Sequence, residues 1–204
     1  MPHPSVMIER LNGETRSFHP DTEADFDVLF STDATVAHYR AYLIGAYSFE
    51  APLEAMLSMT PNLDLMLDVR ERQKAGYLAQ DLLALGMRPA ELAAIPQCLA
   101  IPQFTGAAEA LGWMFVIERM TLAHSIIRRH LATRMPREIN RASAYLSCYT
   151  GVVGTRWRHF GATLDLVARH ATIADRIVAA ALDAFATQRQ WYAIERRSAR
   201  TVAV

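Results

Sequence analysis

Apolar residues recur at helical spacing along most of this chain of 204 residues, and this periodicity limits the fold more than any other feature. The segment DATVAHYRAYLIGAYSFE places four of them on one stripe, Val36, Tyr39, Leu43 and Tyr47. Glycine and proline, which interrupt helices, number only nine each. The sequence therefore predicts an all-α protein.

Prolines, glycines and polar clusters divide this pattern into separate helices. The expected helices cover residues 33–50, 52–59, 63–85, 89–95, 105–134, 137–149, 155–168 and 171–197. Pro52 is expected to start a short helix of its own, because the first helical turn tolerates proline. Gly86 is expected to end the helix before it. Since no linker is long enough to divide the chain, residues 1–204 are predicted to form one helical-bundle domain.

Charge and cysteine content exclude several classes of protein. Lysine and arginine together number 21, as do aspartate and glutamate, so the basic surface of a nucleic-acid-binding protein is not expected. Cys98 and Cys148 lie far apart without zinc-ligand spacing, so neither a disulfide framework nor a zinc site is expected. Lys74 is the only lysine. The arginine bias is attributed to GC-rich codon usage, with carboxylate binding as the alternative.

The N-terminal residues MPHPSVMIERL do not follow the order of a signal peptide, in which a charged start precedes an apolar run. No stretch of about 18 apolar residues without charge is present, so a membrane span is not expected. A cytoplasmic protein without membrane or nucleic-acid partners is the expectation from these features.

Four stretches, in this order, resemble the heme oxygenase family, particularly the bacterial members associated with phytochromes. They are LNGETRSFH (11–19), YRAYLIGAYSFEAPLE (39–54) with KAGYLAQDLLALG (74–86), ALGWMFVIERMTLAHSIIRRHL (110–131) and TRWRHFGATLDL (155–166). The first resembles the family's proximal helix, in which Thr15 and His19 occupy the Thr-x-x-x-His positions. The third resembles the distal helix, and the fourth the segment that carries a basic residue for the heme propionates.

The resemblance implies a heme oxygenase-like helical bundle in which His19 is the axial ligand of the heme iron. It also implies oxidative cleavage of heme, which is both substrate and cofactor, to biliverdin, carbon monoxide and iron with O2. Glu23, four residues after His19, is the expected partner of the second ring nitrogen. The chain has no Gly-x-Gly-x-x-Gly nucleotide loop, so electrons are expected from an external donor, a ferredoxin or a flavin reductase. A bacteriophytochrome is a possible recipient of the product.

Arginines are the expected partners of the propionate carboxylates. The candidates are Arg16, one turn before His19, then Arg158, with Arg156 behind it. Each has the alternative of a solvent-exposed position on its helix. The aromatic residues near these motifs, Phe18, Trp113, Phe115, Trp157 and Phe160, are interpreted as core, because helical spacing explains them without a cofactor.

The distal helix departs from the family pattern, in which two glycines four residues apart face the heme. Here those positions hold Arg119 and Ala123. Three explanations remain open for Arg119: it turns aside to pair with a propionate or Glu118, the helix is rotated, or the protein no longer cleaves heme. Thr121 is expected either to hold a distal water or to bond back to its own helix. His124 is expected to be partly exposed, with a second axial ligand as the alternative.

Pro20 is a second departure, because a proline disfavours helical angles at the residue before it. His19 is therefore expected at a kink or at the start of a new helix. Two functions follow: a heme-degrading monooxygenase, or a catalytically degenerate member that serves as a binding, sensory or interaction module. A helical protein unrelated to heme is the third possibility.

Overall fold

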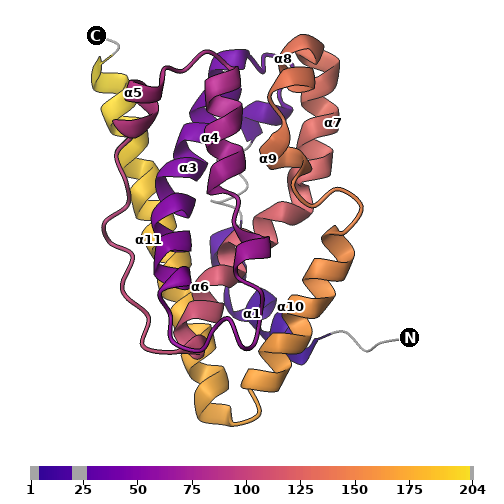
Figure 1. The fold of residues 1–204 in the computed structure, drawn as a ribbon, viewed down its shortest axis with the longest axis vertical. Helices are drawn as coiled ribbons and strands as arrows, with labels where there is room; N and C mark the ends of the chain where they lie inside the picture. Colours follow the sequence, from indigo (N-terminus) through magenta and orange to yellow (C-terminus); the bar gives the residue numbers. More distant parts are fainter. Residues whose placement is uncertain (1–4, 20–26, 203–204) are drawn as a thin grey trace.

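The computed structural model describes residues 5–19 and 27–202, and every regular element in these two ranges is helical (Figure 1). The elements are α1 (Val6–Glu14), η1 (Arg16–Phe18), α3 (Val36–Ser58), η2 (Arg70–Arg72), α4 (Ala75–Ala84), α5 (Pro89–Ala93), α6 (Ala107–Met120), η3 (Thr121–Ala123), α7 (His124–Arg134), α8 (Pro136–Arg141), α9 (Ala144–Ser147), α10 (Val153–Val167) and α11 (Ala171–Val202). The prediction of an all-α bundle is confirmed.

Helices α6 and α11 pack closely along each other, and α11 runs most of the length of the molecule (Figure 1). Gly112 makes the close approach possible, because a Cβ atom at this position would lie only 2.4 Å from the carbonyl oxygen of Ile177. Real Cβ atoms essentially never come this near to another heavy atom. The absence of a side chain at Gly112 therefore sets the spacing between the two helices.

The buried apolar residues form two separate cores, and α3 contributes to both. The later half of α3, including Phe49 and Leu53, belongs to the first core together with α1, α6, α10 and α11. Its earlier half, including Tyr39 and Leu43, belongs to the second core together with α4, α7, α8 and α9. Because α6 lies in the first core and α7 in the second, the short element η3 lies where the chain passes from one core to the other.

The separate helix expected from Pro52 is wrong, because α3 continues through this proline to Ser58. A proline inside a helix has no N–H to donate to the carbonyl one turn earlier, which here is that of Ser48. The backbone N–H of Cys98 donates to this carbonyl instead, at 2.9 Å. A bond from a distant segment thus replaces the helical bond that the proline removes, and the helix is not interrupted.

The helix expected over 63–85 is also wrong in its first half. Asn62 has a positive φ of 60°, residues 60–67 form turns and bends, and only α4 is a regular α-helix within the expected range. Leu63 and Leu67 are both buried, as their periodicity suggested, but they lie on a single turn and not on a helix. The predicted end is confirmed: Gly86 has a φ of 90°, and the N–H of Met87 donates to the carbonyl of Leu82.

The single helix expected over 105–134 is divided into α6, η3 and α7. The helix expected over 137–149 is likewise divided, into α8 and α9. The start of α9 is fixed from another helix, since the Asp81 carboxylate of α4 accepts the backbone N–H groups of Ala144 at 2.8 Å and Tyr145 at 2.9 Å. A tertiary contact of this kind leaves no trace in helical periodicity.

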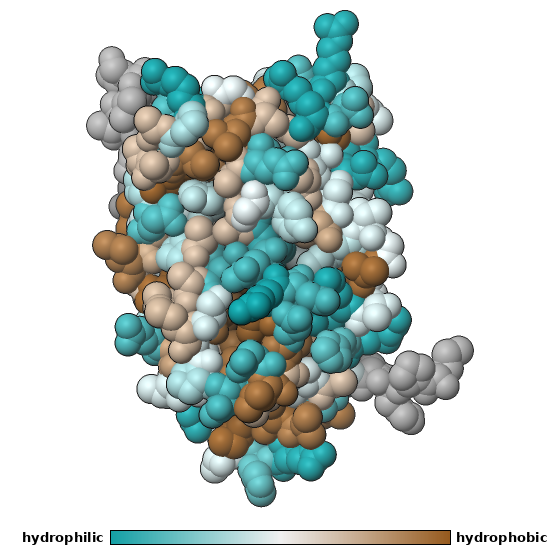
Figure 2. Space-filling view, in the orientation of Figure 1, coloured by the Kyte–Doolittle hydropathy of each residue, from teal (hydrophilic) through white to brown (hydrophobic). Residues whose placement is uncertain are grey.

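Polar residues cover much of the face in Figure 2, and apolar residues gather towards its lower end. Exposed apolar side chains at the end of α3 and in the turns that follow it include Met59, Leu65 and Met66. None of the described helices is sufficiently long and apolar to span a membrane. The charged cluster described below is not part of this surface, because Lys74 at its centre has no exposed area.

Candidate functional site

His19 is half-buried at the end of η1, directly after the turn that follows α1. Its backbone is helical, with φ −61° and ψ −44°, although Pro20 disfavours these angles. The expected kink or new helix at Pro20 lies outside the described residues. The imidazole is held on two sides: the Phe185 ring of α11 lies 5.9 Å away between centroids, and the Thr15 hydroxyl lies 3.0 Å from Nε2. These contacts stabilise a backbone conformation that the proline alone disfavours.

The hydrogen bonds of Thr15 indicate which ring nitrogen of His19 carries a proton. Thr15 is fully buried, and its hydroxyl donates its single proton to the carbonyl of Leu11 at 2.7 Å. The contact with His19 must therefore have the Nε2–H group as donor and the Thr15 oxygen as acceptor. In a neutral ring with this arrangement, the lone pair lies on Nδ1.

A chain of aromatic contacts connects His19 to α6. Phe185 stacks on Phe18 at 5.8 Å and meets the Phe115 ring edge-on at 6.3 Å. Phe115 also contacts Trp157 of α10, at 6.0 Å. The aromatic residues interpreted as core are indeed part of the first core or packed against it. Since Arg119 follows Phe115 by one helical turn, it lies on the same face of α6 as this aromatic chain.

The distal-helix positions surround the interruption between α6 and α7. Arg119 is half-buried in the last turn of α6, and Ala123 is the partly exposed last residue of η3. Thr121 is buried, and its hydroxyl donates to the carbonyl of Glu118 at 2.7 Å, which is the back-bonding alternative expected for it. The Glu118 carboxylate points into a separate cluster, so it is not the partner of Arg119 that one of the three explanations suggested.

The three candidate propionate partners differ in what they already bind. Arg16 and Arg158 are exposed, and Arg158 donates to the Thr155 hydroxyl at 3.2 Å. Arg156 donates to the backbone carbonyl of Glu71 at 2.7 Å, pairs with the Glu71 carboxylate at 3.2 Å and covers the Tyr149 ring at 4.7 Å. Arg16 and Arg158 are thus more accessible to a new carboxylate. Glu23 lies outside the described residues.

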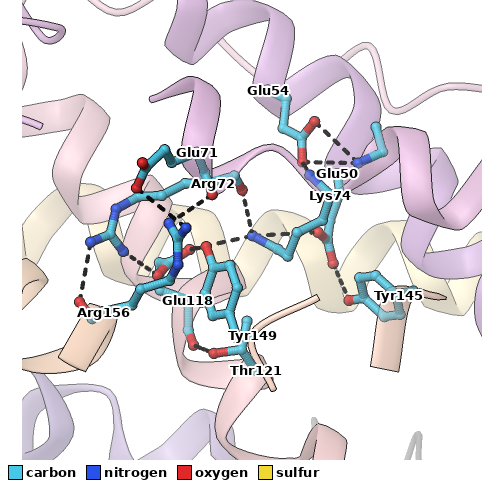
Figure 3. Close-up of polar contacts among 11 residues, drawn as sticks. Glu50, Glu54, Glu71, Arg72, Lys74, Glu118, Thr121, Tyr145, Tyr149 and Arg156 are labelled. Carbon is cyan, nitrogen blue, oxygen red and sulfur yellow. Dashed lines mark hydrogen bonds and ion pairs between the residues drawn. The ribbon is translucent and has the colours of Figure 1, made fainter. Parts of the chain in front are cut away.

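A buried group of charged residues lies between the two cores, and we call it the Lys74 cluster (Figure 3). Its members are Glu50, Glu54, Arg72, Lys74, Glu118, Tyr145 and Tyr149. Glu118 accepts hydrogen bonds from Tyr149 at 2.8 Å and Lys74 at 3.3 Å, and its second oxygen is bound by Arg72. The Lys74 ammonium also donates to the Arg72 carbonyl at 3.1 Å. One cluster thereby connects α3, η2, α4, α6 and the segment after α9.

Carboxylates outnumber cations in the Lys74 cluster, and the pKa values of Lys74 and Glu50 are both raised. Burial would lower the pKa of Lys74, but the charges of Glu118 and Glu50 together raise it above its ordinary value. Burial raises the pKa of Glu50 to about 7, although Lys74 opposes the change. Lys74 is therefore a permanent cation. Glu50, which accepts a hydrogen bond from Tyr145, is the member that gains a proton near neutral pH.

The expectation that His124 is partly exposed is wrong. Its side chain is buried and lies against the Tyr145 ring, with 4.5 Å between centroids. Burial, with a further contribution from the charge of Lys74, lowers the pKa of His124 to about 3, although the nearby backbone of Tyr145 opposes the shift. Within the described part of the chain, neither ring nitrogen has a hydrogen-bond partner. His124 is thus a neutral imidazole at the edge of the Lys74 cluster.

Sequence reasoning missed the Lys74 cluster, although one signal was present. Lys74 is the only lysine in a chain whose other basic residues are arginines, and codon bias does not explain one exception. A compact ammonium with three donors suits a site between carboxylates, where a planar guanidinium has a different shape. The burial of Glu50 and Glu118 carried no comparable signal, because glutamates in general are mostly exposed.

The arrangement of helices resembles that of a known enzyme. A heme oxygenase from Neisseria meningitidis, whose crystal structures were determined with NO and CO bound, matches with a TM-score of 0.70. The match covers 92% of each chain at 18% sequence identity. At this identity the likeness establishes the fold, which is that of the heme oxygenases.

The sequence itself establishes the family. The heme oxygenase family model matches residues 5–193, which is nearly the whole chain. A search of curated proteins gave no match. This chain belongs to the heme oxygenase family, and the resemblance inferred from its motifs is confirmed at that level. Family and fold together support heme degradation in general, whereas the phytochrome-associated subtype stays a prediction.

Proposed function

We propose that this chain binds heme through the imidazole of His19 and cleaves the porphyrin to biliverdin, carbon monoxide and iron. The supporting observation is the family match over residues 5–193, within which the half-buried His19 ring lies against Phe185. When bound, heme supplies the reactive chemistry, because it is both the substrate and the group that reacts with O2. The protein supplies binding, orientation and control of access.

The residues around His19 suit a heme ligand. One protein ligand suffices, since the porphyrin nitrogens supply most of the iron's other bonds. Phe18 and Phe185 offer an apolar surface beside the imidazole, and Thr15 holds one ring nitrogen.

Thr15 provides a test of which nitrogen of His19 binds the iron. If Nδ1 binds, the bond from Nε2–H to Thr15 persists and orients the ring, so Thr15→Val should weaken the binding of hemin. If Nε2 binds, the bond to Thr15 must break at a cost of about 1 kcal/mol, and Thr15→Val should strengthen binding about fivefold. An unchanged dissociation constant would mean that Thr15 does not contribute to the binding of hemin. Thr15→Ser, which keeps the hydroxyl, is the control.

Arg16 and Arg158 are the proposed partners of the propionates, because both are exposed and each can form a bidentate pair with a carboxylate. Arg156 is less suited, since binding a propionate would break its contacts with Glu71. Electrons are proposed to come from a ferredoxin or a flavin reductase. A bacteriophytochrome that takes up biliverdin is the proposed recipient of the product.

The first experiment is a titration of the purified protein with hemin, followed by absorption spectroscopy in the presence of ascorbate or a reductase. A Soret band at stoichiometric hemin, and then a biliverdin spectrum, is the expected result. His19→Ala should remove the axial ligand and change the spectrum. His170→Ala, which alters an exposed histidine between α10 and α11, should leave it unchanged. If His19→Ala bound hemin with the wild-type spectrum, the assignment of the ligand would be wrong.

Arg119 supports a second candidate function, which is heme binding without cleavage. Its side chain is half-buried on the face of α6 that carries Phe115, at a position where the family has glycine. A long cation there reduces the space available to a ligand opposite His19. Hemin binding without biliverdin in the wild type, followed by biliverdin formation in Arg119→Gly, would establish this alternative.

A further inference from the structure

The interruption between α6 and α7 has no glycine to explain it. The helix changes to the 3-10 element η3 over Thr121–Ala123, and the nearest preceding glycine is Gly112, more than two turns earlier. Bends in helices have identifiable causes, which include proline, glycine, and side chains that compete for the helical hydrogen bonds. The chain also changes direction between α6 and α7, and we call this the bend (Figure 1). Since residues 113–134 contain neither proline nor glycine, we attribute the bend to side-chain contacts.

Two contacts converge on Glu118, in the last turn of α6. Its carbonyl accepts the Thr121 hydroxyl at 2.7 Å, and threonine back-bonding of this kind bends helices. Its carboxylate is fixed by Arg72, Lys74 and Tyr149, which belong to other elements. The main chain and the side chain of this one residue are thus both held at the point where the helix changes form.

Lys74 connects Glu118 to the rest of the fold. Its ammonium is fully buried and lies 3.3 Å from the Glu118 carboxylate and 3.9 Å from that of Glu50 on α3 (Figure 3). The backbone N–H of the next residue, Ala75, donates to Glu54 at 3.1 Å, which fixes the start of α4. The position of Lys74 is therefore determined by α3, and through it the position of Glu118 is determined as well.

We propose that Lys74 is a positioning residue for the distal helix: by holding Glu118 it fixes the bend that places Arg119 and Ala123 beside the heme pocket. In this chain a buried ion pair thus holds the helix at positions where the family pattern has glycines. The inference rests on the proposed function only where it concerns the pocket, because the bend is argued from contacts within the protein alone.

The decisive measurement is amide hydrogen exchange of the heme-free protein. In Lys74→Met, exchange at residues 119–124 should accelerate roughly tenfold or more relative to residues 110–117 of the same helix. Using the earlier part of α6 as reference removes the effect of lower global stability. Tyr39→Phe, which loses a buried bond to the Ala142 carbonyl in the second core, is the control and should leave this ratio unchanged.

Thr121→Val covers the case in which Lys74→Met does not fold, because it keeps every charge and removes only the back-bonding hydroxyl. It should change the same exchange ratio, by a smaller factor. An unchanged exchange ratio in Lys74→Met would overturn the proposal. If Lys74→Met does not fold, an unchanged ratio in Thr121→Val would overturn it.

A spectroscopic measurement on the hemin-loaded protein then tests the consequence for the pocket. With CO bound to reduced heme, the C–O stretching band should shift or split in Lys74→Met and stay unchanged in Tyr39→Phe. An unchanged band in Lys74→Met would overturn the positioning role. If the wild type took up no hemin, the proposed function would fail, while hydrogen exchange would still decide whether Lys74 fixes the bend.

Discussion

The two faces of α6 are built on opposite principles. The face towards α11 is apolar and so close that Gly112 can carry no side chain. The other face ends in Glu118, which is as deeply buried but is surrounded by Arg72, Lys74 and Tyr149. Apolar contact gains free energy from each buried area separately, whereas a buried charge is tolerated only when all its partners are present. A single substitution should therefore lower the free energy of unfolding more on the charged face than on the apolar face.

The largest effect is expected on the charged face. Glu118→Ala leaves Arg72 and Lys74 buried without their common partner, so the free energy of unfolding should fall by about 3–5 kcal/mol. Urea denaturation measures this loss. Glu109→Ala, at a glutamate of the same helix whose pair with Arg176 is partly exposed, should cost under about 1 kcal/mol. Equal losses in the two variants would mean that burial of the cluster contributes nothing.

The apolar face should respond less strongly. Gly112→Ala places a Cβ atom against the backbone of α11, and the resulting displacement should cost about 1–3 kcal/mol. Gly76→Ala is the matched control, because this helical glycine has no neighbouring atom within 4 Å and alanine is favoured in helices. Thermal unfolding of both variants should show a lower midpoint for the first and an equal or higher midpoint for the second. A neutral Gly112→Ala would show that the two helices can separate freely.

The pH dependence of the charged face has a definite sign. Burial raises the pKa of Glu50 to about 7, so its contribution to stability is complete below its unfolded pKa and is lost as the pH rises through 7. Between pH 5 and 7, the unfolding free energy of the wild type relative to Glu50→Gln should fall by roughly 2 kcal/mol. His124 contributes with the opposite sign, but it is present in both proteins and cancels. A constant difference across this range would contradict the raised pKa.

The smallest effect is expected where charges meet at the surface. Arg10 of α1 binds Asp175 of α11 at 2.6 Å, but both side chains are substantially exposed. Asp175→Asn should therefore lower the unfolding free energy by under about 1 kcal/mol, and added salt should reduce the difference further. A loss as large as that of Glu118→Ala would remove the distinction between buried and exposed ion pairs.

Much of the fold could be predicted from local signals in the sequence. Helical periodicity predicted the class, and Gly86 ends α4 as expected because a positive φ is easily reached by glycine alone. The predictions that proved wrong concern bonds between distant segments. The N–H of Cys98 keeps α3 intact at Pro52, and the Phe185 ring of α11 contacts His19, whose backbone is helical. Such contacts cannot be predicted from the propensities of the local sequence.

The candidate site also has a part that local sequence predicts and a part that depends on contacts between distant segments. The motif around Thr15 and His19 is readable because both residues lie on one short segment, and the order of four such motifs sufficed to recognise the family. The Lys74 cluster joins residues from positions 50 to 149, and its members apart from Lys74 are ordinary glutamates, tyrosines and an arginine when read singly. The sequence by itself determined that the chain is helical and which family it belongs to, since periodicity and motif order are local properties. Only the tertiary structure decided where the charges are buried and where α6 bends, because burial and pairing depend on which distant segments meet.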